Sequence, residues 1–330
     1  MASADIDLGS VEQAVAFSGS LDKYLKAIEN GFGVTVTGRG QTITINGDEA
    51  DVDMALSACR QILGVLSRNG TLDDQTVDYA IGMTKAGEGT AVEQLSGDCI
   101  MITSRGKPIK PKTVGQKRFV ESIKKNSIVF GIGPAGTGKT YLSVVMAVNA
   151  LKSKEVSRLI LTRPAVEAGE KLGFLPGDLQ TKIDPYLRPL YDALFDTMGA
   201  EVFQKNVERG IIEVAPLAYM RGRTLDDAFI ILDEAQNTTS EQMKMFLTRL
   251  GNGSKMVVNG DVTQIDLPDG KKSGLIEAIR ILSDIEGIDI LRFTNRDIVR
   301  NRLVCAIVNA YEKKSSKDQE KQKEGKRGRK

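Results

Sequence analysis

The fold of this chain can be inferred from one motif, Gly133-Pro134-Ala135-Gly136-Thr137-Gly138-Lys139-Thr140. An apolar run, Ser127–Phe130, precedes it and a helical pattern, Tyr141–Leu151, follows it, so the order is strand, G-x-x-x-x-G-K-[ST], helix. Glycines let successive backbone N–H groups turn inward, and the helix adds its positive dipole end, which together predict a phosphate cradle. Lys139 is expected to reach the β- and γ-phosphates of a nucleotide, and the Thr140 hydroxyl to ligand Mg²⁺.

A second motif ends in paired acids. Phe229-Ile230-Ile231-Leu232 is an apolar strand pattern that runs directly into Asp233-Glu234, the Walker B arrangement. Asp233 is expected to hold Mg²⁺ through its water shell, and Glu234 to orient and activate an attacking water. A carboxylate beside the γ-phosphate is suited to using water, so hydrolysis is favoured over phosphoryl transfer to a small acceptor.

Two amides complete the predicted nucleotide site. Gln264 lies in Val257–Gln264, a strand pattern that ends in a polar turn, where Gln264 or Asp261 is positioned to sense the γ-phosphate. Gln116 precedes the P-loop strand by about ten residues. Its amide offers one donor and one acceptor face, which suits the edge of an adenine.

The composition excludes several chemistries. The chain has no histidine, which removes His-based triads, general bases and metal ligands, and its three cysteines form no C-x-x-C pair. Catalysis must therefore rest on carboxylates, Lys, Arg, hydroxyls and a hard metal ion. No apolar run approaches the roughly 20 residues that span a bilayer, and the N-terminus lacks a signal-peptide pattern, so a cytoplasmic protein without membrane contact is expected.

Charge is distributed unevenly along the chain. Residues 313–330 carry nine Lys or Arg and three Asp or Glu, a net of +6, whereas residues 1–312 have a net charge of −4. This basic tail has no apolar periodicity and is expected to be disordered. It suits either sequence-independent attraction to RNA or simple solubility.

An α/β fold with a mainly parallel sheet is expected from Thr113 onward, because strand-like runs alternate with helical patterns. The apolar runs Arg158–Leu161 and Phe229–Leu232 are continuous and not alternating, as in strands covered on both faces. Strands are predicted near residues 127–132, 157–162, 211–214, 228–233, 255–259 and 288–293. Helices are predicted near residues 116–125, 139–152, 178–197, 200–209, 239–250, 273–285 and 297–313.

The N-terminal residues predict a small α+β domain. After a loosely ordered lead-in over 1–16, a helix is expected over 21–30, a hairpin over 33–47 and an amphipathic helix over 49–66. This helix-strand-strand-helix unit resembles part of a KH domain, although no G-x-x-G loop is expected between two helices. Nucleic-acid binding and protein docking both remain open for it.

Four regions follow from these patterns. They are the KH-like domain over 1–66, a connector over 67–112 with a short helix near 72–83, the P-loop ATPase domain over 113–312, and the tail over 313–330.

A family resemblance adds further expectations. The P-loop, the run 162–178, the block Tyr219–Thr224, Asp233–Asn237 and Gly260-Asp261-x-x-Gln264 together resemble the PhoH-like proteins of bacteria. The resemblance implies a RecA-like P-loop ATPase with Mg²⁺-dependent ATP hydrolysis, a ring-shaped oligomer such as a hexamer, and a link to RNA metabolism or ribosome maturation. It also implies an endoribonuclease or a ribosome-associated factor as partner.

The expected ring-shaped oligomer suggests roles for several arginines. In a ring, an arginine of one protomer can reach the ATP of the next and neutralise transition-state charge. Arg300 is the first candidate for this catalytic role, followed by Arg223 and Arg221. Contact with nucleic-acid phosphates is considered for Arg163, Lys171 and Lys182. The output of the ATPase stays open between an enzyme that acts on RNA and a nucleotide-dependent switch that recruits partners.

Overall fold

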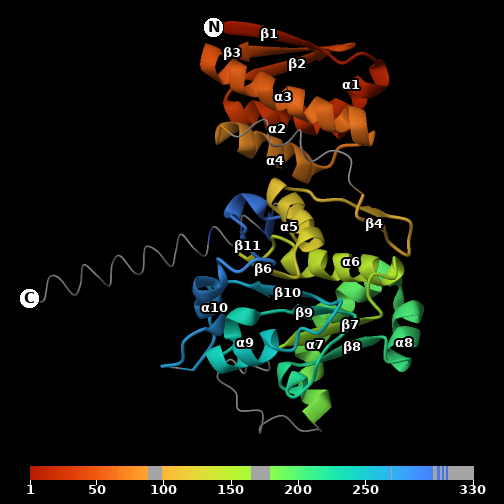
Figure 1. Ribbon diagram of the computed structural model, residues 1–330. Coiled ribbons are helices and arrows are strands. Elements are labelled where there is room, and N and C mark those ends of the chain that lie inside the picture. Colours follow the sequence, from red (N-terminus) through yellow and green to blue (C-terminus); the bar gives the residue numbers. More distant parts are fainter. Residues whose placement is uncertain are drawn as a thin grey trace, which may run out of the picture.

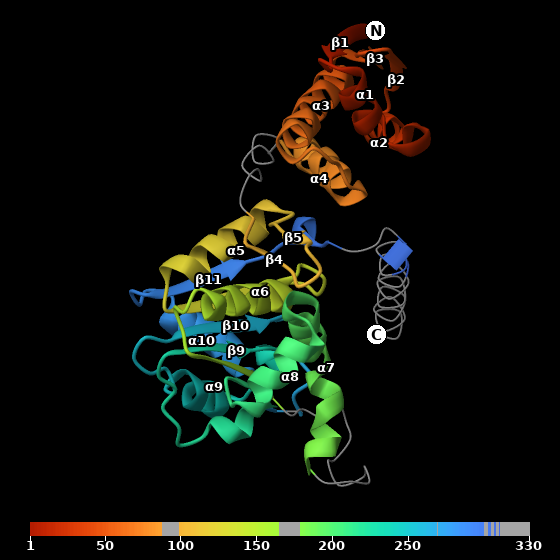
Figure 2. The same ribbon diagram turned by 90° about the vertical axis from the view of Figure 1, so that its right-hand side faces the viewer.

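The computed structural model describes residues 1–87, 99–164, 179–268 and 270–299, together with positions 303, 304, 307 and 310. Figures 1 and 2 show two parts, a small N-terminal domain beyond helix α5 (Val114–Lys125) and a larger domain built around one sheet. Among the described residues, no helix combines the length and apolar composition required to cross a bilayer.

The larger domain contains a six-stranded parallel sheet in the order β11-β6-β10-β9-β7-β8. Its strands are β6 (Ile128–Ile132), β7 (Arg158–Arg163), β8 (Ile212–Pro216), β9 (Ala228–Leu232), β10 (Lys255–Gly260) and β11 (Ile288–Arg292). All six predicted strands are confirmed. With the edge strand β8 set aside, the chain-order sequence is 5-1-4-3-2, which is RecA-like because β10 separates the P-loop strand from the Walker B strand.

Helices cover both faces of this sheet. Val129, Leu161 and Ile231 face a core closed by α5, α6 (Lys139–Lys152) and α7 (Leu179–Met198), and their strand neighbours face a second core against α9 and α10. This alternation follows from the strand period of two, and it explains why the central strands β6 and β9 are buried at every position. The remaining helices are α8 (Ala200–Glu208), α9 (Ser240–Leu247) and α10 (Gly274–Leu282).

The helix predictions agree with these bounds to within a few residues. The last one, over 297–313, lies mostly outside the described residues, although positions 303, 304, 307 and 310 are helical. The tail over 313–330 lies outside them entirely.

The N-terminal domain is larger than predicted. Residues 1–16 were expected to be a loosely ordered lead-in, and this is wrong: β1 (Ala2–Asp7) pairs with β3, and α1 (Val11–Ser18) packs against α2 and α3. The domain's elements are β1, α1, α2 (Lys23–Phe32), β2 (Thr35–Arg39), β3 (Thr42–Gly47), α3 (Glu49–Asn69) and α4 (Asp74–Lys85), with the antiparallel sheet ordered β1-β3-β2. Its core continues past residue 66, because α4 contributes Val77 and Ala80.

A tight turn joins α1 to α2, where the sequence predicted no such loop. The turn Gly19-Ser20-Leu21-Asp22 lies between these two helices, and its fourth residue is Asp22 where a G-x-x-G loop has glycine. Leu21 and Asp22 both have left-handed backbone angles, with φ of 56° and 57°. Residues 1–87 carry twelve acidic and six basic side chains. A carboxylate in the turn and a net charge of −6 both repel phosphate.

The small domain contacts the larger one beside the P-loop. The Val114 backbone N–H donates to the Tyr79 hydroxyl of α4 at 2.9 Å, and the Lys112 ammonium contacts Asp73 at 3.3 Å. The chain between the two domains forms a short antiparallel ribbon of β4 (Met101–Ile102) and β5 (Pro108–Ile109), which packs on the core of the larger domain. Helix α4 is thus anchored at the first turn of α5, and α5 carries Gln116.

Candidate nucleotide site

The P-loop turns sharply between β6 and α6. Gly133, Gly136 and Gly138 have φ of +151°, +87° and +82°, values that L side chains rarely adopt. A Cβ atom on Gly133 would lie 2.7 Å from the backbone oxygen of Phe293, so no other residue fits there. The Gly133 N–H also donates to the Gly260 carbonyl at 3.1 Å, which fixes the loop to β10.

Gln116 lies outside the nucleotide cavity and bonds the backbone of the P-loop. Its Nε2 donates to the Thr137 carbonyl at 3.0 Å and its Oε1 accepts from the Lys112 N–H at 2.7 Å, with 5% of the residue exposed. Gln116 does not line the nucleotide cavity. The sequence assigned this amide to the edge of an adenine. Its nitrogen and its oxygen each bond one backbone group of the chain, and the adenine contact stays a prediction.

The two acids lie at the carboxyl end of β9, opposite the start of α6. Asp233 is 2% exposed and its Oδ1 accepts from the Thr140 hydroxyl at 2.7 Å. Glu234 has a left-handed backbone, with φ of 54°, and 44% of its side chain is exposed. Strain of this kind persists where the surroundings fix it. The Asn237 N–H donates to the Glu234 carbonyl at 3.1 Å within this turn, and the Gln236 amide orients the side chain by donating to Glu234 Oε2 at 2.6 Å.

These residues surround a cavity of about 280 Å³. Its lining is Ala135, Gly136, Gly138, Lys139, Thr140, Tyr141, Asp233, Glu234, Gly260, Asp261 and Gln264. Most of the residues singled out in the sequence for nucleotide binding, including Gln264, line this cavity. The presence of Tyr141 in the lining was not predicted. Burial of its hydroxyl, and secondly its hydrogen bond to Asp196, raise the pKa of Tyr141.

A larger hollow, about 500 Å³, lies at the opposite end of the strands between Lys154, Ser157, Asn206 and Asp227. The described residues that line it include no glycine-rich loop and no helix N-terminus. The smaller cavity is the candidate site because the P-loop and both acids converge on it.

Lys139 is folded onto its own loop. Its Nζ donates to the Gly133 carbonyl at 2.6 Å, to the Pro134 carbonyl at 2.9 Å and to the Thr137 hydroxyl at 3.3 Å. An ammonium group that bonds neutral carbonyls can exchange them for phosphate oxygens, which accept stronger, charge-assisted bonds. Lys139 is therefore positioned to close on a bound triphosphate.

The donor set fits a magnesium ion that is shared with a nucleotide. Among the described residues, no cluster of three His, Cys, Asp or Glu side chains could chelate a metal by itself. Mg²⁺ commonly binds through one or two protein oxygens together with substrate phosphates, and Thr140 and Asp233 supply that pair. Oδ2 of the buried Asp261 has no hydrogen-bond partner in the described part of the chain, so the cavity retains capacity to bind a cation or water.

The basic residues considered from sequence are found in four different situations. Arg163, at the end of β7, contacts both Asp233 and Glu234, which the sequence did not predict. Arg223 makes a two-pronged ion pair with Glu213, at 2.6 and 2.7 Å, and this hydrogen bonding raises its pKa. Arg221 is exposed after the 3₁₀ turn Leu217–Met220. Arg300, Lys171 and the Lys182 side chain lie outside the described residues.

The sheet order and the P-loop with its facing acids define a P-loop nucleotide-binding ATPase. A family model described as "PhoH-like protein" matches residues 108–312, and the chain belongs to this family.

Several curated relatives are similar over most of the chain. A PhoH-like protein of Bacillus subtilis is 52% identical, with 93% of this chain and 97% of the relative covered. One of Mycobacterium tuberculosis is 56% identical, with 90% and 84% covered. Protein PhoH of Escherichia coli is 47% identical, with 62% and 58% covered. Among solved structures, the Sulfolobus solfataricus SWI2/SNF2 ATPase core in complex with dsDNA is 16% identical, with 44% and 31% covered and a TM-score of 0.30.

Proposed function

We propose that this chain binds ATP together with Mg²⁺ and hydrolyses it, and that it uses the cycle to act on RNA. The observation that supports hydrolysis is the 2.7 Å contact between Thr140 and Asp233, with Glu234 beside it on the wall of the same cavity. Mg²⁺ would neutralise phosphate oxygens there. Thr140 and Asp233 would hold it, Lys139 would bind the phosphates, and Glu234 would accept a proton from the attacking water.

The RNA part of the proposal rests on the family resemblance and on the basic tail. The net charge of −6 over residues 1–87, together with Asp22 in the α1–α2 turn, opposes phosphate binding by the N-terminal domain. We therefore expect RNA to contact the ATPase domain and residues 313–330. Phosphate contacts there would make affinity fall as salt is added.

A nucleotide-dependent switch is the second candidate function, and one network of contacts favours it. Helix α4 holds the Val114 N–H, α5 carries Gln116, and Gln116 holds the Thr137 carbonyl of the P-loop. A rearrangement of the P-loop around a nucleotide would thus be transmitted through Gln116 and α5 to helix α4 of the N-terminal domain. Such a device could recruit an endoribonuclease or a ribosome-associated partner in the cytoplasm without moving a strand.

ATP hydrolysis by the purified full-length chain, measured with and without Mg²⁺ and with and without single-stranded RNA, tests both functions. We expect turnover that requires Mg²⁺ and rises when RNA is added. Turnover that ignores RNA would favour the switch. No Mg²⁺-dependent turnover under either condition would overturn the proposed hydrolysis.

Assembly into a ring, with hexamer as the expected size, is proposed together with an arginine supplied by the neighbouring protomer. Arg300→Ala is expected to preserve ATP binding and to lose turnover, because no guanidinium would neutralise the negative charge on the phosphoryl group in the transition state. Arg223→Ala is the comparison, since that guanidinium is held by Glu213 within its own chain. Unchanged turnover of Arg300→Ala at saturating ATP would refute the Arg300 assignment.

A further inference from the structure

Arg163 holds both acidic residues of the candidate site. It is the last residue of β7, and 14% of its side chain is exposed. Its Nε and Nη2 donate to Asp233 Oδ2 at 2.9 and 2.6 Å, and its Nη2 also contacts Glu234 Oε1 at 3.2 Å. A rigid planar guanidinium that donates to one carboxylate oxygen through both Nε and Nη2 fixes the position of that oxygen as well as neutralising the charge.

The Asp233 carboxylate is divided between two partners. Its Oδ2 accepts from Arg163, while its Oδ1 accepts from the Thr140 hydroxyl at 2.7 Å. The arginine therefore sets which oxygen is presented to the side of the cavity where Thr140 lies. The same guanidinium limits the freedom of the half-exposed Glu234, whose other oxygen is held by Gln236.

A helix holds Arg163 in turn. Its Nη1 donates to the Tyr186 carbonyl of α7 at 2.7 Å. The contacts to Asp233, Glu234 and Tyr186 use four of the five N–H donors of the guanidinium. The sequence considered Arg163 for contact with nucleic-acid phosphates, but its donors are committed to the interior of the ATPase domain.

We propose that Arg163 is a positioning residue for ATP hydrolysis, which orients Asp233 toward the metal and Glu234 toward the attacking water and ties both to α7. The inference rests on the proposed hydrolysis. Arg163 acts through the two acids and does not itself contact the reacting atoms. Groups that orient a metal ligand from behind typically account for about 10–100-fold in metal affinity or activity.

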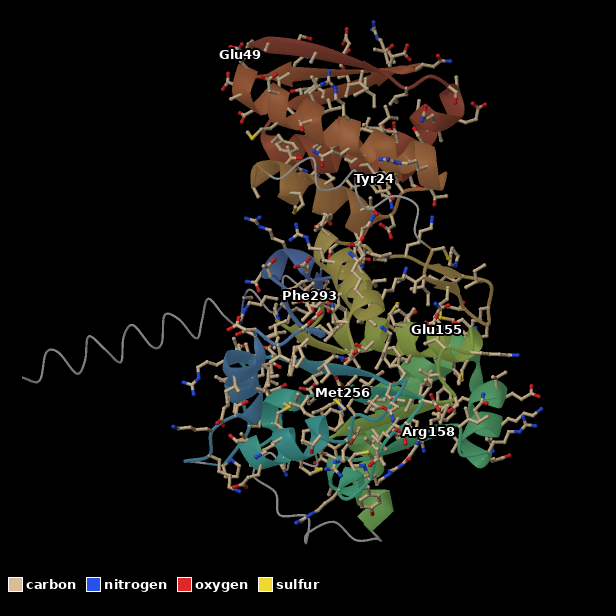
Figure 3. All side chains as sticks on the ribbon, in the orientation of Figure 1. Tyr24, Glu49, Glu155, Arg158, Met256 and Phe293 are labelled. Carbon is tan, nitrogen blue, oxygen red and sulfur yellow. The ribbon has the colours of Figure 1, made fainter. Side chains whose placement is uncertain are left out.

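The test compares Arg163→Gln with Arg163→Lys and Arg158→Gln. Arg158, labelled in Figure 3, begins the same strand at its other end and donates to the Asp226 carbonyl, so it is a matched control. We expect Arg163→Gln to lower kcat about 10–100-fold and to raise the Mg²⁺ concentration that gives half-maximal activity, with KM for ATP within about threefold. Arg163→Lys retains the charge without the fork and should recover only part of kcat.

Two further measurements separate positioning from a general structural role. Added guanidinium ion should restore part of the activity of Arg163→Ala, since a free ion can occupy the same space between the acids, whereas it should leave Arg158→Gln unchanged. Measuring nucleotide affinity at several Mg²⁺ concentrations tests whether Asp233 is correctly oriented, and this measurement does not require hydrolysis. If the wild-type chain hydrolysed no ATP, that result would count against the proposed function and not against the role of Arg163. A kcat and a Mg²⁺ midpoint of Arg163→Gln within twofold of wild type would overturn the proposal, as would equal losses in Arg158→Gln.

Discussion

Glu234→Gln is expected to abolish most ATP turnover while leaving Mg²⁺-ATP binding intact. The substitution preserves the size of the side chain and an oxygen that can still accept from the Gln236 amide, so the left-handed turn at this position should persist. It replaces the carboxylate that would accept a proton from the attacking water with an amide, which cannot act as a base. A positioned general base contributes about 10²–10⁴-fold to rate, and we expect kcat to fall within that range.

Single-turnover hydrolysis and titration with a fluorescent ATP analogue measure the two halves of this expectation. Glu241→Gln is the control, because Glu241 lies exposed in the first turn of α9, a few residues further along, and does not line the cavity. The assignment fails if Glu234→Gln turns over ATP within about threefold of wild type. It also fails if nucleotide binding is lost in parallel, since Glu234 would then be part of the binding site and not a base.

The sheet domain could be predicted from sequence because each of its strands is recognisable alone. Strands buried on both faces are continuously apolar, and Phe229–Leu232 illustrates this with every residue at or below 1% exposure. The P-loop and the paired acids are likewise local patterns. Parallel strands bring their carboxyl ends to one edge, which is why Lys139, Asp233 and Gln264 converge although they are distant in sequence.

The N-terminal strand was missed for the opposite reason. Ala2–Asp7 reads Ala-Ser-Ala-Asp-Ile-Asp, in which Ile6 is the one large apolar side chain. Its strand conformation comes from pairing with β3, where Ile6 lies opposite Ile43. A short strand with few apolar residues is specified by its partner, and the partner is not visible in the local sequence.

Arg163 and Gln116 were singled out in the sequence, but their partners within the chain were not predicted. The role of Arg163 depends on β7 lying next to β9, a neighbour relation that no local pattern reveals. The amide of Gln116 was correctly judged to need a donor and an acceptor partner. Both partners proved to be backbone groups, the Lys112 N–H and the Thr137 carbonyl. Side-chain chemistry restricted what these residues bind, and the topology determined where the partners lie.

Lys139→Ala should weaken ATP binding on the order of 10²-fold with little change in the stability of the protein alone. Hydrogen bonds between a charged donor and its acceptor contribute about 1.5–3 kcal/mol, and each 1.4 kcal/mol is tenfold in affinity. Within the chain, Lys139 bonds the carbonyls of Gly133 and Pro134, both of which are partly exposed and can accept from water instead. The cost of removing the ammonium should therefore appear mainly when phosphate is present.

Thermal unfolding at a fixed Mg²⁺-ATP concentration distinguishes these contributions. At a ligand concentration of about 100 Kd, the wild-type chain should gain about 2.7 kcal/mol from binding. A variant with a Kd about 100-fold weaker should gain only about 0.4 kcal/mol at the same concentration. Lys152→Ala, at the exposed far end of the same helix, should retain the full ligand-induced shift. Equal shifts for Lys139→Ala and wild type would show that Lys139 remains on its own loop and that the phosphates are held by backbone N–H groups alone.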